Sequence, residues 1–263
     1  MMKKLGYGFM AALCLGTFAN AFALTQEEAV KQWEAALRSG DAKKVVALFP
    51  DSYVKDANKV IQSFAENMDE ELWNRSRETA ALFVDVLAVQ SENALGGGAF
   101  MGMQIPKSDE EKNKQVREGL KALANFLRSD SMGLRALRKS DVATLASGLM
   151  PAISKLAAES KPADKDETPP SSPFADIQMR QVEGKWIPAD MAKGWKEGID
   201  NALKGIKDMD FASAEGQATK AQVMTMMTSM QPMFKRLESA KSPEDFQMQM
   251  MMLMIPIMMQ MSN

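Results

Sequence analysis

The sequence predicts a mainly α-helical protein: a multi-helix bundle of antiparallel helix hairpins with one small β-hairpin at about residues 175–187. Apolar side chains recur at three- and four-residue spacing along most of the 263 residues, and capping residues stand before these segments. Only residues 177–182 alternate as a strand does, before the turn Glu183-Gly184 and a return strand at 185–187. Glycine accepts the positive φ of a tight hairpin loop, so this stretch predicts the hairpin.

The N-terminus has the three parts of a secretory signal peptide. Lys3 and Lys4 precede an apolar run at residues 5–18, and Ala21-Phe22-Ala23 offers a small-x-small cleavage site. The run is shorter than the roughly 20 residues that a permanent transmembrane helix needs. We expect residues 1–23 to be a signal peptide cleaved after Ala23, and a periplasmic or extracellular protein without a transmembrane span.

Cysteine and histidine are absent after residue 23. The one cysteine, Cys14, lies in the apolar run, where the bulky Leu13 before it disfavours a lipoprotein site. The absence of cysteine and histidine from the mature chain excludes a thiol nucleophile, a disulfide, a Cys/His zinc site and a Ser–His relay. Loss of Lys3 and Lys4 takes the formal net charge from −2 to −4, without a basic patch for nucleic acid. The sequence therefore indicates no catalytic residue, no cofactor and no nucleic-acid partner.

The mature chain is expected to form one domain in two parts. Residues 24–158 predict an N-terminal helical bundle, and residues 174–263 predict the β-hairpin and C-terminal helices packed on it. Between them, residues 159–173 are rich in charged residues, proline and serine and predict a disordered loop. A glycine triplet at 96–98 begins a second loop, to residue 107, without the Gly-Lys-Ser/Thr of a phosphate-binding loop.

In the first part, each helix is predicted by a capping residue followed by apolar periodicity. The expected caps share a side-chain oxygen that can accept a backbone N–H: Thr25 (with Glu28), Asp41, Asp51 or Ser52, Asp69 and Ser108 (with Glu111). Gly40 and Pro50 end the first two helices, and the helix after Asp69 carries an apolar face from Leu72 to Ser91. Pro151 stands inside the last helical pattern of this part and predicts a kink or break.

Three helices are predicted after the hairpin. Asp190 opens the first, which carries Trp195, and residues 208–219 predict a loop. A helix from about residue 220 bears an apolar stripe with Val223 and is expected to kink at Pro232. Ser242, followed by proline and two acids, predicts the start of the last helix.

Four stretches carry a family resemblance. They are Leu48-Phe-Pro-Asp-Ser-Tyr53 with Lys55-Asp56, Phe64-Ala-Glu-Asn-Met-Asp69, Glu183-Gly-Lys-Trp-Ile-Pro188 continuing to Trp195, and Ser239-Ala-Lys-Ser-Pro-Glu-Asp-Phe246. Together they resemble a family of uncharacterised secreted proteins from bacteria of the Planctomycetes–Verrucomicrobia group. The resemblance implies a signal peptide and a mostly helical body, and it implies no known activity. Residues 36–41 and the Gly-Lys-Trp ending at Trp186 also resemble NTF2-like domains, whose several-stranded sheet this sequence does not supply.

Two sets of residues could carry chemistry, although a structural role is favoured for both. Asp69, Glu70 and Glu71 are close carboxylates, which can run hydrolysis in pairs but also complement the dipole at a helix start. The same structural role is expected of Asp41, Asp51 and Asp56. Trp186 and Trp195 could stack on a sugar or peptide, but are expected to share a core, with Lys185 an exposed turn residue.

Thirteen methionines fall between residues 224 and 261. Those on the Val223 stripe keep one helical face and predict core packing. Residues 246–261 carry no charge, are apolar all round and are interrupted by Pro256, so they must be covered, self-associate, or meet a protein or membrane. The expected interaction surface is Phe246, Met250, Met254, Ile257 and Met258. Thioethers also bind Cu(I), and the candidate ligands are Met248, Met250, Met251, Met252, Met254, Met258, Met259 and Met261.

These patterns favour a secreted, non-catalytic binding protein that acts through a methionine-rich apolar surface, of envelope-assembly or chaperone type. Its partner would be another protein or a second copy of the chain, meeting the C-terminal helix. A carboxylate-based hydrolase acting on an envelope polymer is the second hypothesis, and a Cu(I)-binding protein is the third.

Overall fold

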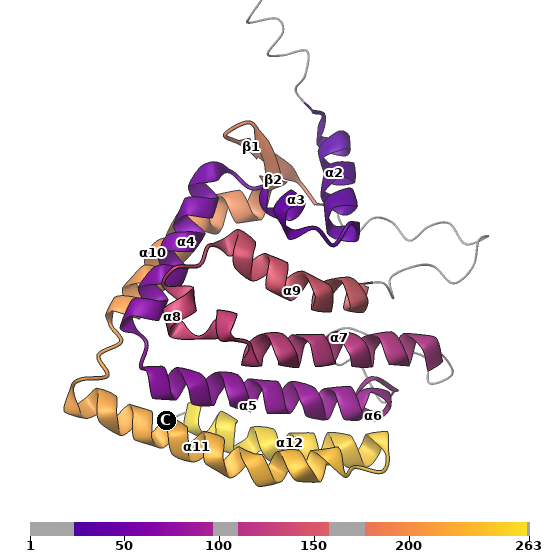
Figure 1. Ribbon diagram of the computed structural model, residues 1–263, viewed down its shortest axis with the longest axis vertical. Helices are drawn as coiled ribbons and strands as arrows, with labels where there is room; N and C mark the ends of the chain where they lie inside the picture. The colour runs from indigo at the N-terminus through magenta and orange to yellow at the C-terminus, as the bar shows by residue number, and fades with distance from the viewer. Residues whose placement is uncertain (1–23, 97–109, 158–176, 262–263) are drawn as a thin grey trace, which may run out of the picture.

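Helices make up most of the computed structural model, which describes residues 24–96, 110–157 and 177–261 (Figure 1). Those before the hairpin are α2 (Gln26–Arg38), α3 (Ala42–Val46), α4 (Asp51–Asn67), α5 (Glu70–Val89), α6 (Ser91–Gly96), α7 (Glu110–Arg128), the 3₁₀ helix η1 (Asp130–Met132), α8 (Leu134–Leu137) and α9 (Val142–Ala157). Strands β1 (Met179–Val182) and β2 (Lys185–Pro188) precede α10 (Ala189–Lys207), α11 (Ala214–Glu238) and α12 (Pro243–Met261). The predicted fold class, mainly α with one small hairpin, is confirmed.

The long helices form a layered stack. Helices α9, α7 and α5 lie one beyond another, and α11 and α12 cover the far side of α5 (Figure 1). Neighbouring helices in this stack are antiparallel. Arg128 at the end of α7 pairs with Glu78 in the middle of α5, whereas Arg117 earlier in α7 pairs with Glu92 just beyond the end of α5. Likewise, Lys155 near the end of α9 pairs with Glu118 in the middle of α7, whereas Gly148 earlier in α9 lies against Phe126 near the end of α7. The antiparallel neighbours are therefore α5, α7 and α9, which are joined by the longer connections at residues 90–109 and 129–141.

A second arrangement joins the two parts of the chain: α4–α5 and α10–α11 run side by side in the same direction. Trp195 of α10 donates to Asp56 of α4, and Arg75 of α5 donates to Thr228 of α11. Further along, Gln90 donates to the carbonyl of Glu238. Residue numbers therefore increase in the same direction along both segments, which makes them parallel. Figure 1 shows α4 and α10 slanting together along one end of the stack.

The helix starts confirm some predicted caps and correct others. Thr25 and Glu28 form a capping box, and Asp41 and Asp69 each accept backbone N–H groups of the helix that they precede. The prediction of Asp51 or Ser52 as a cap is wrong, because Pro50 holds that position and Asp51 is already helical. The loop expected to begin at Gly96 starts later, because Gly96 is the last residue of α6. Ser108, the rest of that loop and the loop expected at 159–173 lie outside the described residues.

Two helices in the second half, α10 and α11, begin earlier than the sequence predicts. Pro188, with its fixed φ, is the N-cap of α10, so Asp190 lies inside the first turn rather than opening the helix. Ser213 accepts the N–H of Gly216 and begins α11 well before the predicted residue 220. Helices α9 and α11 continue through Pro151 and Pro232 as single segments, so the break considered at Pro151 does not occur.

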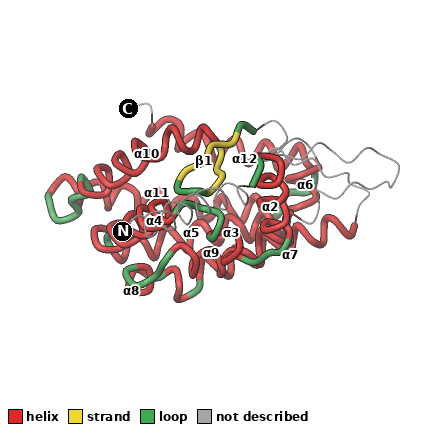
Figure 2. Tube along the Cα trace, turned by 90° about the horizontal axis from the view of Figure 1, so that it is seen from above, coloured by secondary structure: helices red, strands yellow, loops and turns green. Residues whose placement is uncertain are grey.

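The hairpin is the only sheet in the described chain (Figure 2), and its turn takes positive φ at both Glu183 (52°) and Gly184 (74°). Two successive positive φ values match the right-handed twist of the strands. Its β2 residue Ile187 is fully buried in the hairpin cluster, whose buried members are Trp33, Tyr53, Met179 and Ile187.

Polar contacts fasten this hairpin to the first helices. Trp33 of α2 donates its indole N–H to the carbonyl of Trp186 at 2.9 Å. Lys185 Nζ donates to the Phe49 carbonyl at 2.8 Å and lies 2.9 Å from Asp51 Oδ1. Lys185 is therefore a half-buried bridge and not the exposed turn residue that was predicted.

The two tryptophans meet the same core, as predicted. Trp186 and Trp195 are partly buried against the hairpin cluster. Trp195 stacks on Tyr53 with ring centroids 4.1 Å apart and the planes parallel to within 1°. The hairpin thus joins α2, α4 and α10 at one end of the molecule.

Replacement of Ile187 by alanine should lower the free energy of unfolding by about 3 kcal/mol, because it leaves a cavity where the side chain has no solvent exposure. Urea unfolding measures the loss. Gln181→Ala, at an exposed position of β1, is the matched control and should leave stability nearly unchanged. Equal stability of the two variants would contradict the anchoring role of the hairpin.

Candidate functional site

The last helix, α12, begins where the sequence predicts. The N–H of Asp245 donates to Ser242 Oγ at 3.2 Å. The Asp245 carboxylate accepts from Gln249 Nε2 at 2.8 Å and from the N–H of Lys241 at 3.1 Å. These hydrogen bonds hold the pKa of Asp245 below its ordinary value, and the bond from Gln249 has the largest effect. The first turn of the helix is therefore fixed by its own polar groups.

One face of α12 belongs to the core. Phe246 and Leu253 are each only 3% exposed, and Met250 between them is partly buried. This spacing of four and three residues places all three on one helical face. They complete the stack cluster, whose buried members are Val86, Leu87, Phe234, Leu237, Ala240, Phe246 and Leu253. The prediction of Phe246 as an interaction residue is wrong, because its ring fills this cluster instead.

The other described side of α12 is a methionine face, formed by Met248, Met251 and Met252. Their side chains are 49%, 63% and 53% exposed. They stand at spacings of three and four residues and so share one side of the helix. The side chains of Met254, Ile257 and Met258, which complete the predicted interaction surface, lie outside the described part. Within that part, the apolar surface of α12 is half covered and half open.

The predicted copper ligands are divided between these two faces. Met250 packs inward, whereas Met248, Met251 and Met252 face outward. The side chains of Met254, Met258, Met259 and Met261 are not described. A copper ion could therefore meet at most three of the four described sulfurs on one face. Among the described residues there is also no group of three acids, histidines or cysteines that could hold a metal ion.

The acids at the start of α5 act in the fold. Asp69 Oδ1 accepts the N–H of Leu72 at 2.9 Å and lies 2.9 Å from Lys220 Nζ. The same ammonium is 2.8 Å from Glu71 Oε2, so Lys220 ties α11 to the first turn of α5. The Leu72 N–H, followed by Lys220, holds the pKa of Asp69 below its ordinary value.

A groove with a volume of about 750 Å³ runs between α5 and α11. Its lining residues are Glu70, Glu71, Asn74, Arg75, Glu78, Met224 and Thr228. All three carboxylates stand on α5, and the α11 wall supplies a thioether and a hydroxyl. Glycoside hydrolysis by two carboxylates requires one on each side of the bond to be cut. This groove lacks that facing pair, so its geometry does not favour the hydrolase hypothesis.

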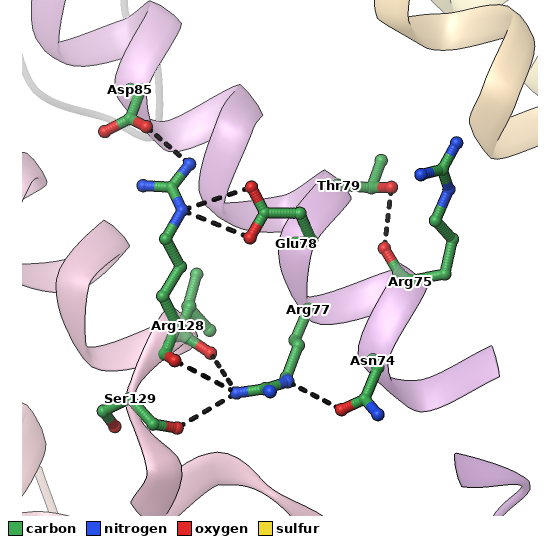
Figure 3. Close-up of polar contacts among 9 residues, drawn as sticks. Asn74, Arg75, Arg77, Glu78, Thr79, Asp85, Arg128 and Ser129 are labelled. Carbon is green, nitrogen blue, oxygen red and sulfur yellow. Dashed lines mark hydrogen bonds and ion pairs between the residues drawn. The ribbon is translucent and has the colours of Figure 1, made fainter. Parts of the chain in front are cut away.

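Behind this groove, arginines fasten α5 to α7 (Figure 3). Arg77 Nη1 donates to the carbonyls of Leu127, Arg128 and Ser129 at 3.4, 3.2 and 3.0 Å, where α7 ends. Arg128 lies 2.7 Å from Asp85 and 3.2 Å from Glu78. Both carboxylates raise the pKa of the Arg128 guanidinium, and Asp85 has the larger effect. Glu78 is thus neutralised from the α7 side, and neither arginine is available to a ligand in the groove.

A smaller hollow of about 320 Å³ lies between α4 and α10. Tyr53 and Trp195 form one wall, and Trp195 Nε1 donates to Asp56 Oδ2 at 3.0 Å. With Asp41 capping α3 and Asp51 paired to Lys185, the acids at 41, 51 and 56 all have structural partners, as predicted.

Comparison with known proteins identifies no relative: no family model, curated protein or solved structure matches this chain. None of the described helices combines the length and apolar character of a membrane span.

Replacement of Asp69 by alanine should lower the free energy of unfolding by about 1 kcal/mol at neutral pH, because α5 loses its N-cap acceptor. The folded-state pKa of Asp69 is lowered, so its charge stabilises the fold above the unfolded-state pKa and ceases to do so as pH falls through the folded-state value. The difference between wild type and variant should therefore shrink in acid.

Urea unfolding at neutral pH and at about pH 2 measures that change. Asp69→Asn keeps a capping oxygen without the charge, so it should retain most of the stability that alanine loses. A difference between wild type and Asp69→Ala that is independent of pH would contradict the charged role of Asp69.

Proposed function

We propose that this protein is a secreted, non-catalytic binding protein that holds apolar segments of other proteins on the methionine face of α12. The single observation that carries the proposal is that Met248, Met251 and Met252 are exposed, on a helix whose opposite side packs in the core. A helix anchored in this way offers its apolar side in a fixed position.

The chemistry of methionine suits a partner of variable shape. Its unbranched side chain has several rotatable bonds and a polarisable sulfur, so it adapts to different apolar surfaces. The exposed residues adjoin one another at helical spacing, and grouped apolar exposure of this kind is typical of interaction sites. Chaperone-like or envelope-assembly binding needs this tolerance more than it needs a shaped pocket.

Export is part of the proposal. The lysines at 3–4, the apolar run at 5–18 and the cleavage site ending at Ala23 support it, as does the resemblance to secreted proteins. Absence of cysteine after residue 23 suits an oxidising compartment, because no thiol is available for mispairing. The partners would then be proteins of the envelope in an unfolded or assembling state.

The triple variant Met248→Gln, Met251→Gln and Met252→Gln should lose binding to apolar segments while remaining folded, because all three side chains are solvent-exposed. Two measurements check this: fluorescence of the dye anilinonaphthalene sulfonate, and suppression of the aggregation of reduced α-lactalbumin. Both should decrease severalfold relative to wild type, since the variant removes the apolar face.

Ile153→Gln is the matched control. Ile153 is an exposed apolar residue (37%) on α9, and α7 and α5 separate α9 from α12 in the stack (Figure 1). This control should behave as wild type. The proposal is wrong if the triple variant suppresses aggregation as well as wild type, or if Ile153→Gln loses the activity equally.

A further inference from the structure

The charges that line the α5–α11 groove are not all neutralised within the protein. Glu71 lies 2.8 Å from Lys220, and Glu78 lies 3.2 Å from Arg128. Among the described residues, Glu70 and Arg75 have no ion-pair partner, although both line the groove. The groove therefore presents one free carboxylate and one free guanidinium to whatever enters it.

Arg75 is held in place without being neutralised. Its Nη2 donates to Thr228 Oγ1 at 3.2 Å, and the Thr228 hydroxyl in turn donates to the carbonyl of Met224 at 2.9 Å. Its Nε is enclosed and lacks a hydrogen-bond partner in the described part of the chain. In Figure 3 the Arg75 side chain extends away from the network of Arg77 and Arg128. A half-buried cation positioned by a neutral hydroxyl is suited to receive an anion.

Other groups around Arg75 complement the two ends of a zwitterion. The acids of α5 repel a simple anion, so a ligand needs a positive charge of its own to meet Glu70. Met224 adds an apolar surface between these groups.

The positions of Glu70 and Arg75 along the axis of α5 give an approximate length for the ligand. Glu70 and Arg75 are five residues apart on α5, which corresponds to a rise of about 7.5 Å. An extended peptide advances about 3.5 Å per residue, so two or three residues separate an ammonium from a carboxylate by a comparable distance. The groove volume of about 750 Å³ accommodates such a ligand.

From this arrangement we infer that the α5–α11 groove binds short zwitterionic peptides of two or three residues. Arg75 holds the C-terminal carboxylate, Glu70 holds the N-terminal ammonium, and Met224 contacts the side chains. This binding site is distinct from the methionine face, and it does not depend on the function proposed for that face.

Calorimetric titration of the purified protein with trialanine tests the inference. Trialanine should bind, and N-acetyl-trialanine and trialanine amide, which each lack one terminal charge, should bind about tenfold more weakly. Arg75→Gln and Glu70→Gln should each weaken trialanine binding by a similar factor. Arg135→Gln and Glu197→Gln, at exposed positions outside the groove, are the matched controls and should leave the affinity unchanged.

Several results would overturn this inference. One is the absence of binding heat at trialanine concentrations up to about 10 mM. Another is equal affinity for trialanine, its capped forms and sodium acetate, which would show that the termini are not recognised. A third is wild-type affinity in Glu70→Gln, a change at an exposed first-turn residue that leaves the core untouched. The methionine-face triple variant should bind trialanine normally, which separates this site from the other.

Discussion

The packing of α11 along α5 is the contact on which the C-terminal half of the molecule depends. It buries Leu237 completely against the apolar face of α5, and the same cluster receives Phe246 and Leu253 from α12. One side of α12 is thereby held, and the methionine face is left on the outside. The contact also supplies both walls of the groove around Arg75. Both candidate surfaces are thus consequences of one helix pairing.

The parts of the fold that could be predicted are those decided locally. A capping oxygen acts on backbone groups two or three residues away, so Thr25, Asp41 and Asp69 could be recognised from the sequence. The start of α11 could not, because Gly216 resembles a loop residue. Glycine is required at residue 216 because a Cβ there would lie 1.8 Å from the carbonyl oxygen of Asp210 in the preceding turn. Such close approaches of backbone to backbone leave no periodic signal.

The candidate sites could be predicted only in outline. Residues 246–261 are apolar on every side, so periodicity could not separate Phe246, which is buried, from Met251, which is exposed. Only the position of α12 against the stack cluster makes that distinction. Arg75 carried no signal at all, because its groove forms between helices about 150 residues apart in the sequence, as its bond to Thr228 shows. Lys185 was misjudged for the same reason, since its partners Phe49 and Asp51 belong to another part of the chain.

The side-by-side course of α4–α5 and α10–α11 has a consequence for how the molecule acquires its shape. Val86 and Leu253 belong to one cluster, so the apolar face of α5 is not fully covered until the last helix has been made. Contacts between such distant residues carry a large loop-closure entropy and form late in folding. During synthesis, which starts at the N-terminus, the core therefore remains incomplete until α12 has been made. Until then the chain is accessible to chaperones and proteases.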